Sequence, residues 1–187
     1  MSTNISNRGT GAGGSNTNKN GLSFEELTVL NTEYKEISEN KNHNIIKFNK
    51  DSNFFVESSQ ANFYKYMKIN KDEHNIGHGC KKPDECYINE SSKKIFIIEK
   101  KFQQCSGSVC EKIQTAPFKI WQYKKLFPKY EIHYIYVLSK WFKNNCKSEL
   151  EYLDENKIKY FIISRSYKKQ IIKYITSKIN STNKIDN

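Results

Sequence analysis

Hydrophobic and polar positions in the first third of the chain indicate one helix, two short strands and a second helix. Apolar side chains first recur at near-helical intervals, at Phe24, Leu27, Val29 and Leu30. Ser23 with Glu26 makes a capping box ahead of them, so we predict a helix over about Ser23–Glu39. Three further elements are expected, namely strands over Asn44–Phe48 and Asn53–Val56 and a helix over Gln60–Ile69.

Two β-favouring runs in the middle of the chain predict a hairpin. They span Asp84–Ile88 and Ile95–Lys101, and the residues between them have turn composition. Because side chains alternate across a strand, Glu99 and Lys101 are expected on one face, and the hairpin can bring Asp84 beside them. Four apolar residues precede Glu99, which places its carboxylate at the end of a buried strand, where it needs a cation as partner.

The second half of the chain alternates helical and strand patterns. Ser108 with Glu111 makes a capping box for a helical stretch that Pro117 kinks or restarts. The remaining predicted elements are interior strands over Glu131–Leu138 and Tyr160–Ser164 and helices over Lys147–Glu155 and Ser166–Ile179. This alternation predicts an α/β fold, with a mixed central β-sheet flanked by helices on both faces.

The length of 187 residues suits one ordinary domain. We expect a flexible Gly/Ser/Asn-rich N-terminal segment over residues 1–20, a single domain over 21–180 and a tail over 181–187. The N-terminal glycines do not make a phosphate-binding loop, because no strand precedes them and no Gly-Lys-Ser/Thr follows.

The charge balance favours a polyanionic partner. The chain has 31 Lys and Arg against 20 Asp and Glu, a net charge of +11, which makes nucleic acid the leading partner class. The alternative is that an AT-rich coding sequence simply produces many Lys, Asn and Ile residues. Five cysteines and no start typical of a signal peptide favour reduced thiols in the cytoplasm. No apolar run approaches the roughly 20 residues that span a bilayer, so no membrane association is expected.

Asp84, Glu99 and Lys101 are the candidate catalytic residues. Two carboxylates are hard oxygen ligands of the kind that hold Mg²⁺, with Mn²⁺ as a substitute, against a substrate phosphate. A nearby lysine can hold the attacking water or offset charge in the transition state. The trio therefore suits hydrolysis of a phosphodiester.

Pro83-Asp84 followed by Glu99-Lys100-Lys101 resembles the PD-(D/E)xK nuclease superfamily, in particular small type II restriction endonucleases. The resemblance implies a restriction-endonuclease-like sheet and Mg²⁺ at Asp84, Glu99 and the Lys100 backbone carbonyl. It also implies that Lys101 lies near the nucleophilic water. The expected protein is a homodimer that cuts double-stranded DNA at a specific sequence and leaves a 5′-phosphate, with a cognate DNA methyltransferase acting on the same sequence.

Two further segments extend the resemblance. The stretch Asn20–Glu25 resembles the N-terminal helix of that family, which implies Glu25 as a further acidic residue near the metal. The stretch Gly107–Thr115 resembles the helix that follows the motif strand in some restriction enzymes. Residues near the site or the DNA are then Gln103, Glu111, Lys112 and Gln114.

Other functions remain open at this stage. The same core could belong to a structure-selective nuclease of the junction-resolvase or repair type, or to a catalytically inactive DNA-binding protein. The acidic residues could also be ordinary strand-end charges, with Glu99 paired to Lys100 or Lys101, and the helix macrodipole alone favours an acid at Glu25.

Two other groups of residues allow more than one interpretation. A weaker hypothesis is a zinc site at His74, His78, Cys80 and Cys86, which lacks paired Cys-x2-Cys units. An aromatic and basic stretch fits either a DNA-facing surface or a core helix with a solvated face, and comprises Trp121, Tyr123, Phe127 and Tyr130 with Lys119, Lys124, Lys125 and Lys129.

Overall fold

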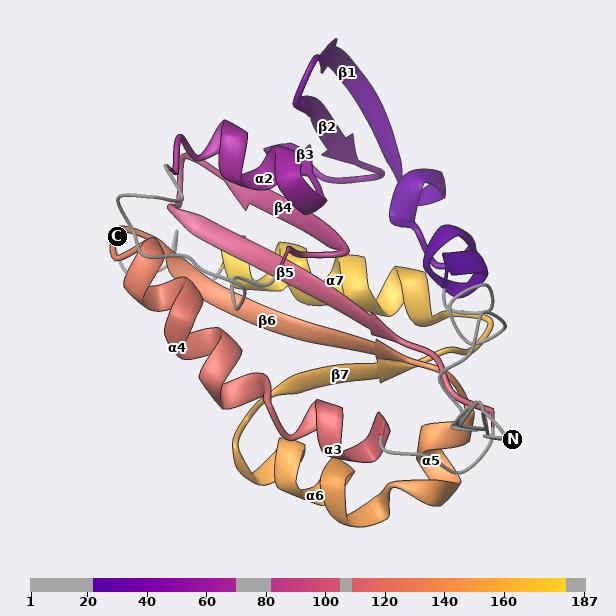
Figure 1. The fold of residues 1–187 in the computed structure, drawn as a ribbon. Helices are drawn as coiled ribbons and strands as arrows, with labels where there is room; N and C mark the ends of the chain where they lie inside the picture. Colours follow the sequence, from indigo (N-terminus) through magenta and orange to yellow (C-terminus); the bar gives the residue numbers. More distant parts are fainter. Residues whose placement is uncertain (1–21, 70–81, 105–108, 181–187) are drawn as a thin grey trace, which may run out of the picture.

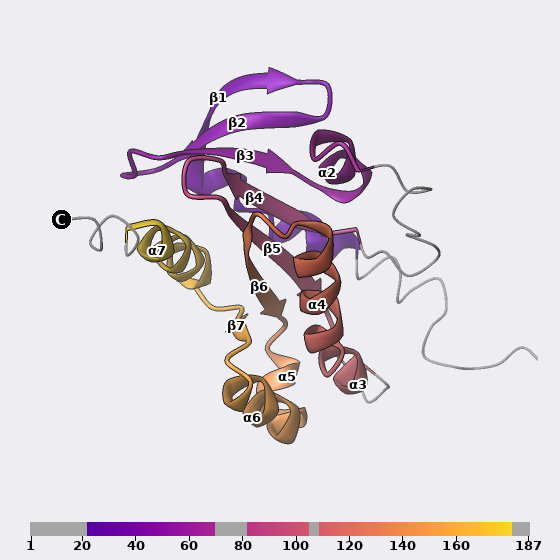
Figure 2. The same cartoon turned by 90° about the vertical axis from the view of Figure 1, so that its left-hand side faces the viewer.

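A mixed sheet is the centre of the fold (Figures 1 and 2). The computed structural model describes residues 22–69, 82–104 and 109–180. Among these residues seven strands form one sheet in chain order, namely β1 (Tyr34–Asn40), β2 (His43–Phe48), β3 (Phe54–Ser58), β4 (Glu85–Asn89), β5 (Lys94–Lys101), β6 (Glu131–Leu138) and β7 (Lys159–Ile162). Neighbours pair antiparallel from β1 to β5 and parallel from β5 to β7.

Helices cover both faces of this sheet. The face that we call the front packs against α2 (Gln60–Tyr66), α3 (Val109–Ile113), α4 (Ala116–Leu126), α5 (Trp141–Asn145) and α6 (Lys147–Glu155). The rear face packs against the helix over residues 22–27, the 3-10 helix η1 (Leu30–Glu33) and α7 (Tyr167–Asn180). Figure 2 shows α7 on one side of the sheet and α4 on the other. The predicted α/β class and mixed sheet are confirmed.

The alternation of side chains along β4 and β5 assigns their residues to the two faces. In β5, Ile95 and Ile97 belong to the front core, whereas Phe96 and Ile98 belong to the rear core. The predicted hairpin is confirmed, and its two strands are buried on both faces. This is why the apolar run before Glu99 is continuous.

The predicted helix over Ser23–Glu39 is wrong in its second half. The helix ends at residue 27, where the Thr28 hydroxyl donates a hydrogen bond of 2.6 Å to the Phe24 carbonyl. After η1 the chain forms β1, an edge strand that pairs with β2 and is mostly exposed. The near-helical spacing of apolar residues ends at Leu30, and beyond η1 the pairing with β2 decides the structure.

One other prediction needs correction, and one helix was missed. The strand near Tyr160 is β7, which pairs only with β6 among the described strands and is therefore an edge strand and not an interior one. The short helix α5 was not predicted. The expectations for residues 1–20 and 181–187 and for Ser108 as a helix cap lie outside the described residues. Within the described residues, no helix is both long and apolar enough to cross a membrane.

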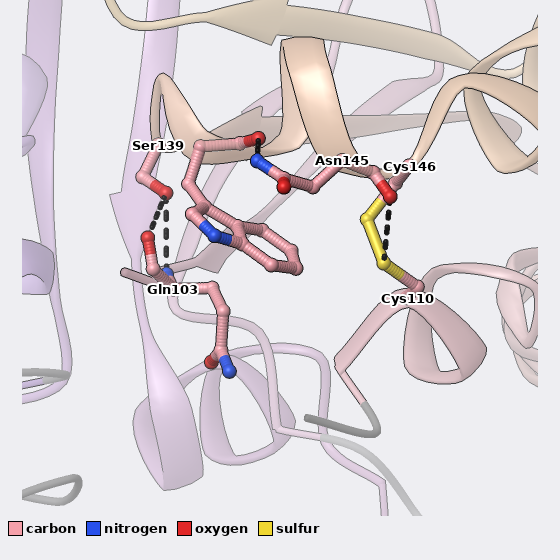
Figure 3. The surroundings of a disulfide bond; sticks show 6 residues. Gln103, Cys110, Ser139, Asn145 and Cys146 are labelled. Carbon is pink, nitrogen blue, oxygen red and sulfur yellow. Dashed lines mark hydrogen bonds between the residues drawn. A yellow bond between two sulfur atoms is a disulfide. The ribbon is translucent and has the colours of Figure 1, made fainter. Parts of the chain in front are cut away.

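A disulfide joins two helical segments on the front face. It connects Cys110 of α3 to Cys146, which lies between α5 and α6, with 5.8 Å between their Cα atoms (Figure 3). The prediction of reduced thiols is therefore wrong for this pair. Cys86 of β4 is a free and buried thiol.

Candidate active site

The open end of the β4–β5 hairpin brings Asp84 and Glu99 together on the front face. The antiparallel register pairs Glu85 with Ile98, and one further step sets Asp84 opposite Glu99. The Lys100 backbone N–H donates a hydrogen bond of 2.7 Å to Asp84 Oδ2, which fixes this carboxylate against the end of β5. The predicted proximity of the two acidic residues is thus present in the fold.

Two lysines share the carboxylate of Glu99. Its side chain lies deep in the front face, and Oε1 is 2.7 Å from Lys101 Nζ and 2.8 Å from Lys119 Nζ. Burial pushes the pKa of Glu99 upward, but the two ammonium groups outweigh burial and hold this pKa below its usual value. Glu99 is therefore an anion over the whole neutral pH range.

Asp84 has the opposite electrostatic balance. Burial first, and then the negative charge of Glu99, raise the pKa of Asp84 from 3.8 to about 6, and Glu25 adds to this rise. The hydrogen bond from Lys100 and the charge of Lys101 only partly oppose it. The surroundings of Asp84 therefore disfavour its charged form, and a cation bound at this position would stabilise that form.

Lys119 was predicted only as a DNA-facing or solvated lysine of the aromatic and basic stretch, and not as a residue of the site. It lies in α4, is 6% exposed, and directs its ammonium to Glu99. Ala116 and Tyr123, three residues before and four after it, are also buried in the front core. That helical spacing is the one sequence signal that could have placed Lys119 inward.

A second ion pair lies directly behind the candidate site, on the rear face of the same two strands. Glu85 Oε2 and Lys100 Nζ are 2.7 Å apart, and their side chains are 5% and 1% exposed. Glu85 Oε1 also accepts hydrogen bonds from the Leu30 backbone N–H (3.0 Å) and the Tyr87 hydroxyl (2.8 Å). The Lys100 ammonium is therefore buried and ion-paired in the rear core, away from Asp84 and Glu99 on the front face.

Glu25 lies on the helix over residues 22–27, and its side chain is an electrostatic neighbour of Asp84. It does not form a tight cluster with Asp84 and Glu99. In the part of the chain that the structure describes, the group of three potential ligands within 4.8 Å of one another is Cys110, Cys146 and Glu149, at the disulfide. Mg²⁺ retains several waters in proteins, so an acidic residue at longer range can act through one of them.

The polar residues predicted after the motif strand lie on the segment between β5 and α4. Gln103 uses its backbone N–H and carbonyl to bind the Ser139 hydroxyl, at 3.2 and 2.9 Å (Figure 3). Glu111, Lys112 and Gln114 are exposed on or beside α3. Gln114 lines a surface pocket of about 410 Å³ with Ser148, Glu149 and Tyr152.

The aromatic and basic stretch divides between core and surface. Tyr123 and Phe127 are buried in the front core, whereas Trp121 is 54% exposed. The proposed zinc ligands His74, His78 and Cys80 lie outside the described residues, and Cys86 is buried in the front core. For the aromatic and basic stretch, the core interpretation therefore holds for two of the four aromatic residues, Tyr123 and Phe127.

The donor set suits a hard divalent cation. Asp84 and Glu99 bring carboxylate oxygens from two neighbouring strands to one face, with a lysine ammonium beside them. Neither cysteine nor histidine is part of this set, which favours Mg²⁺ or Mn²⁺ over zinc. Comparison of the chain with known protein families, curated proteins and solved structures gave no match.

Proposed function

We propose that the protein is a Mg²⁺-dependent DNA endonuclease with a restriction-endonuclease-like core. The observation that carries this proposal is the position of Asp84 opposite Glu99 on one face of the sheet, with Lys101 2.7 Å from Glu99. The net charge of +11 supports a polyanionic substrate. The site has two acids at neighbouring positions, and its two lysines, Lys101 and Lys119, both contact Glu99.

In the proposed mechanism Asp84, Glu99 and the Lys100 carbonyl would hold the metal. When bound, Mg²⁺ supplies Lewis acidity and lowers the pKa of a coordinated water. Lys101, whose ammonium contacts Glu99, would orient the attacking water and offset the charge on the phosphate. Lys119 holds Glu99 from the α4 side and keeps this carboxylate in one orientation.

The biological setting belongs to the same proposal. We propose double-stranded DNA cut at a specific sequence as substrate, a homodimer as the active form and a cognate DNA methyltransferase as a functional partner. The proposed location is the cytoplasm, where disulfides are rare. Titration of free thiols in protein from freshly lysed cells tests this location, because the structure has Cys110 and Cys146 as a disulfide, whereas the cytoplasm keeps most thiols reduced.

Incubation of the purified protein with supercoiled plasmid and Mg²⁺ or Mn²⁺ tests the activity. Asp84→Asn and Glu99→Gln are expected to abolish cleavage while DNA binding survives. Glu90→Gln is the matched control, since Glu90 is an acid at the opposite end of the β4–β5 hairpin, bound by Tyr66 and Tyr130. Unchanged cleavage by either site variant would refute the proposal. A defined banding pattern on linear DNA would separate sequence-specific cutting from a structure-selective nuclease.

A non-catalytic DNA-binding protein is the second candidate function. It is favoured by the two lysines on Glu99 Oε1, which already neutralise this carboxylate. Such a protein would bind DNA with a steep salt dependence but leave the plasmid intact in either metal.

A further inference from the structure

The rear ion pair connects the candidate site to the N-terminal helix. Lys100 Nζ donates a hydrogen bond of 2.8 Å to the backbone carbonyl of Glu25, while the backbone N–H of Lys100 holds Asp84 on the front face. One residue therefore holds one of the proposed acidic residues through its main chain and supports the backbone of another through its side chain.

The segment from Glu25 to Leu30 is fixed at several points. Glu85 accepts a hydrogen bond from the Leu30 N–H, and Lys168 of α7 donates one of 2.6 Å to the Val29 carbonyl. The Phe24 ring packs on Phe102, just beyond the end of β5, with 5.3 Å between the ring centroids. The helix that carries Glu25 is thus held beside the catalytic end of β5.

The buried position of the Glu85–Lys100 pair does not by itself explain why the pair is present. Burial of an ion pair is weak support for stability, because apolar replacements of both partners are often neutral or better. The pair therefore matters more for the groups that it orients than for stability. The ammonium of Lys100 contacts both Glu85 and the Glu25 carbonyl, and the backbone N–H of the same lysine holds Asp84.

We propose that the Glu85–Lys100 pair positions Glu25 at the metal site, so that Lys100 governs metal affinity through a side chain that contacts neither metal nor DNA. This inference rests on the proposed function. Glu85 and Lys100 are then positioning residues, and Glu25 is a distal acidic group that binds the hydrated metal through water. Removal of such supporting contacts in metal sites typically weakens affinity by about 10-fold to 100-fold.

The test uses Glu85→Gln/Lys100→Met in the full-length protein. The amide introduced by Glu85→Gln keeps an oxygen acceptor for Leu30 and Tyr87, and Lys100→Met removes only the ammonium that holds the Glu25 carbonyl. The readout is the Kd for Mn²⁺ by calorimetry, without DNA. We expect binding to weaken by about 10-fold, and Glu25→Gln to weaken it by a similar factor. The triple variant should bind no more weakly than the double variant, since both changes act through Glu25.

Lys94→Met is the matched control. Lys94 lies on the same strand and the same face, has a buried side chain, and donates a 2.6 Å hydrogen bond to the carbonyl of Lys178 in α7. It lies at the end of β5 away from the site, so its loss should leave the Mn²⁺ Kd unchanged.

The outcomes separate this inference from the proposed function. Wild-type affinity in the double variant, or an equal loss of affinity in Lys94→Met, would overturn the inference while cleavage by the wild type still stands. If the double variant does not fold, Glu25→Gln alone decides, because unchanged Mn²⁺ binding there also overturns it. Failure of the proposed function would appear differently, as the absence of both plasmid cleavage and Asp84-dependent Mn²⁺ binding in the wild-type protein.

Discussion

The two faces of the β4–β5 hairpin carry charged side chains from consecutive residues, but these side chains have very different ion-pair and hydrogen-bond partners on the two faces. On the rear face Glu85 and Lys100 are one acid and one base, almost fully buried, with hydrogen bonds to neighbouring groups. On the front face Asp84 lies opposite Glu99, and Glu99 shares one oxygen between two lysines. The rear arrangement is one acid with one base, whereas the front one places two acids side by side with both lysine contacts on Glu99.

Under the proposed function, the rear pair has a structural role and the front pair a functional one. A charged Asp84 reduces the stability of the fold, because burial and the charge of Glu99 raise its pKa to about 6. Selection for stability alone would therefore not favour an acid at this position. Groups with strongly perturbed pKa values in such surroundings are candidates for functional sites. The following predictions test whether the two faces differ in this way.

Removal of one member of the rear pair is expected to have the largest effect on stability. Lys100→Met leaves Glu85 buried without its cation, which typically costs about 3–5 kcal/mol. Glu85→Gln/Lys100→Met should recover most of that loss, because no unpaired charge remains. Urea unfolding measures both values. A loss below about 1 kcal/mol in the single variant would show that water reaches Glu85 and that the rear face is not a closed core.

Asp84→Asn should stabilise the protein at high pH, whereas Lys100→Met destabilises it. The folded-state pKa of Asp84 is raised from 3.8 to about 6, so ionised Asp84 destabilises the folded state above pH 6. The neutral amide removes this penalty and is expected to raise the free energy of unfolding at pH 8 by up to about 3 kcal/mol.

The sign of this effect depends on pH in a defined window. A raised folded-state pKa means that the wild type gains relative stability as pH falls from about 6 to about 4, where Asp84 becomes protonated. The advantage of Asp84→Asn should therefore shrink below about 1 kcal/mol at pH 4. Urea titrations at both pH values measure it. A variant that is less stable than the wild type at pH 8 would show that Asp84 is a structural anion.

The hairpin and its acidic pair could be predicted from the sequence because both depend on local rules. Two β-favouring runs around a polar turn fix the hairpin, and the two-residue period of strands assigns Glu99 and Lys101 to one face. The same local rules failed for β1, which the predicted helix over Ser23–Glu39 included but whose backbone pairs with β2. Strand pairing of that kind depends on residues elsewhere in the chain.

The partners of the charged groups could not be predicted in the same way. The contact of Lys119 with Glu99 spans 20 residues, and that of Lys100 with the Glu25 carbonyl spans 75. Among 31 lysines and arginines no local pattern marks these two as buried, apart from the spacing of Lys119 with Ala116 and Tyr123. Only the packing of α4 and of the helix over residues 22–27 against the sheet brings them to their partners.

The two lysines on Glu99 allow the finest test of the front face, with the smallest expected effects on stability. The side chain of Lys119 is 8% exposed and that of Lys101 22%, so water screens the Lys101 contact more. Lys119→Met is expected to cost about 1.5 kcal/mol and Lys101→Met less than about 1 kcal/mol. The order should reverse for cleavage, because Lys101 is the proposed partner of the attacking water.

In both variants the pKa of Glu99, followed by carboxyl NMR titration, should rise, since each loses an ammonium that lowers it. A depressed folded-state pKa gives stability that is lost as pH falls, so both variants should also lose less stability on acidification than the wild type. If Lys119→Met abolished cleavage and Lys101→Met preserved it, Lys119 would be the lysine at the attacking water, and the motif would assign the wrong ammonium to the reaction.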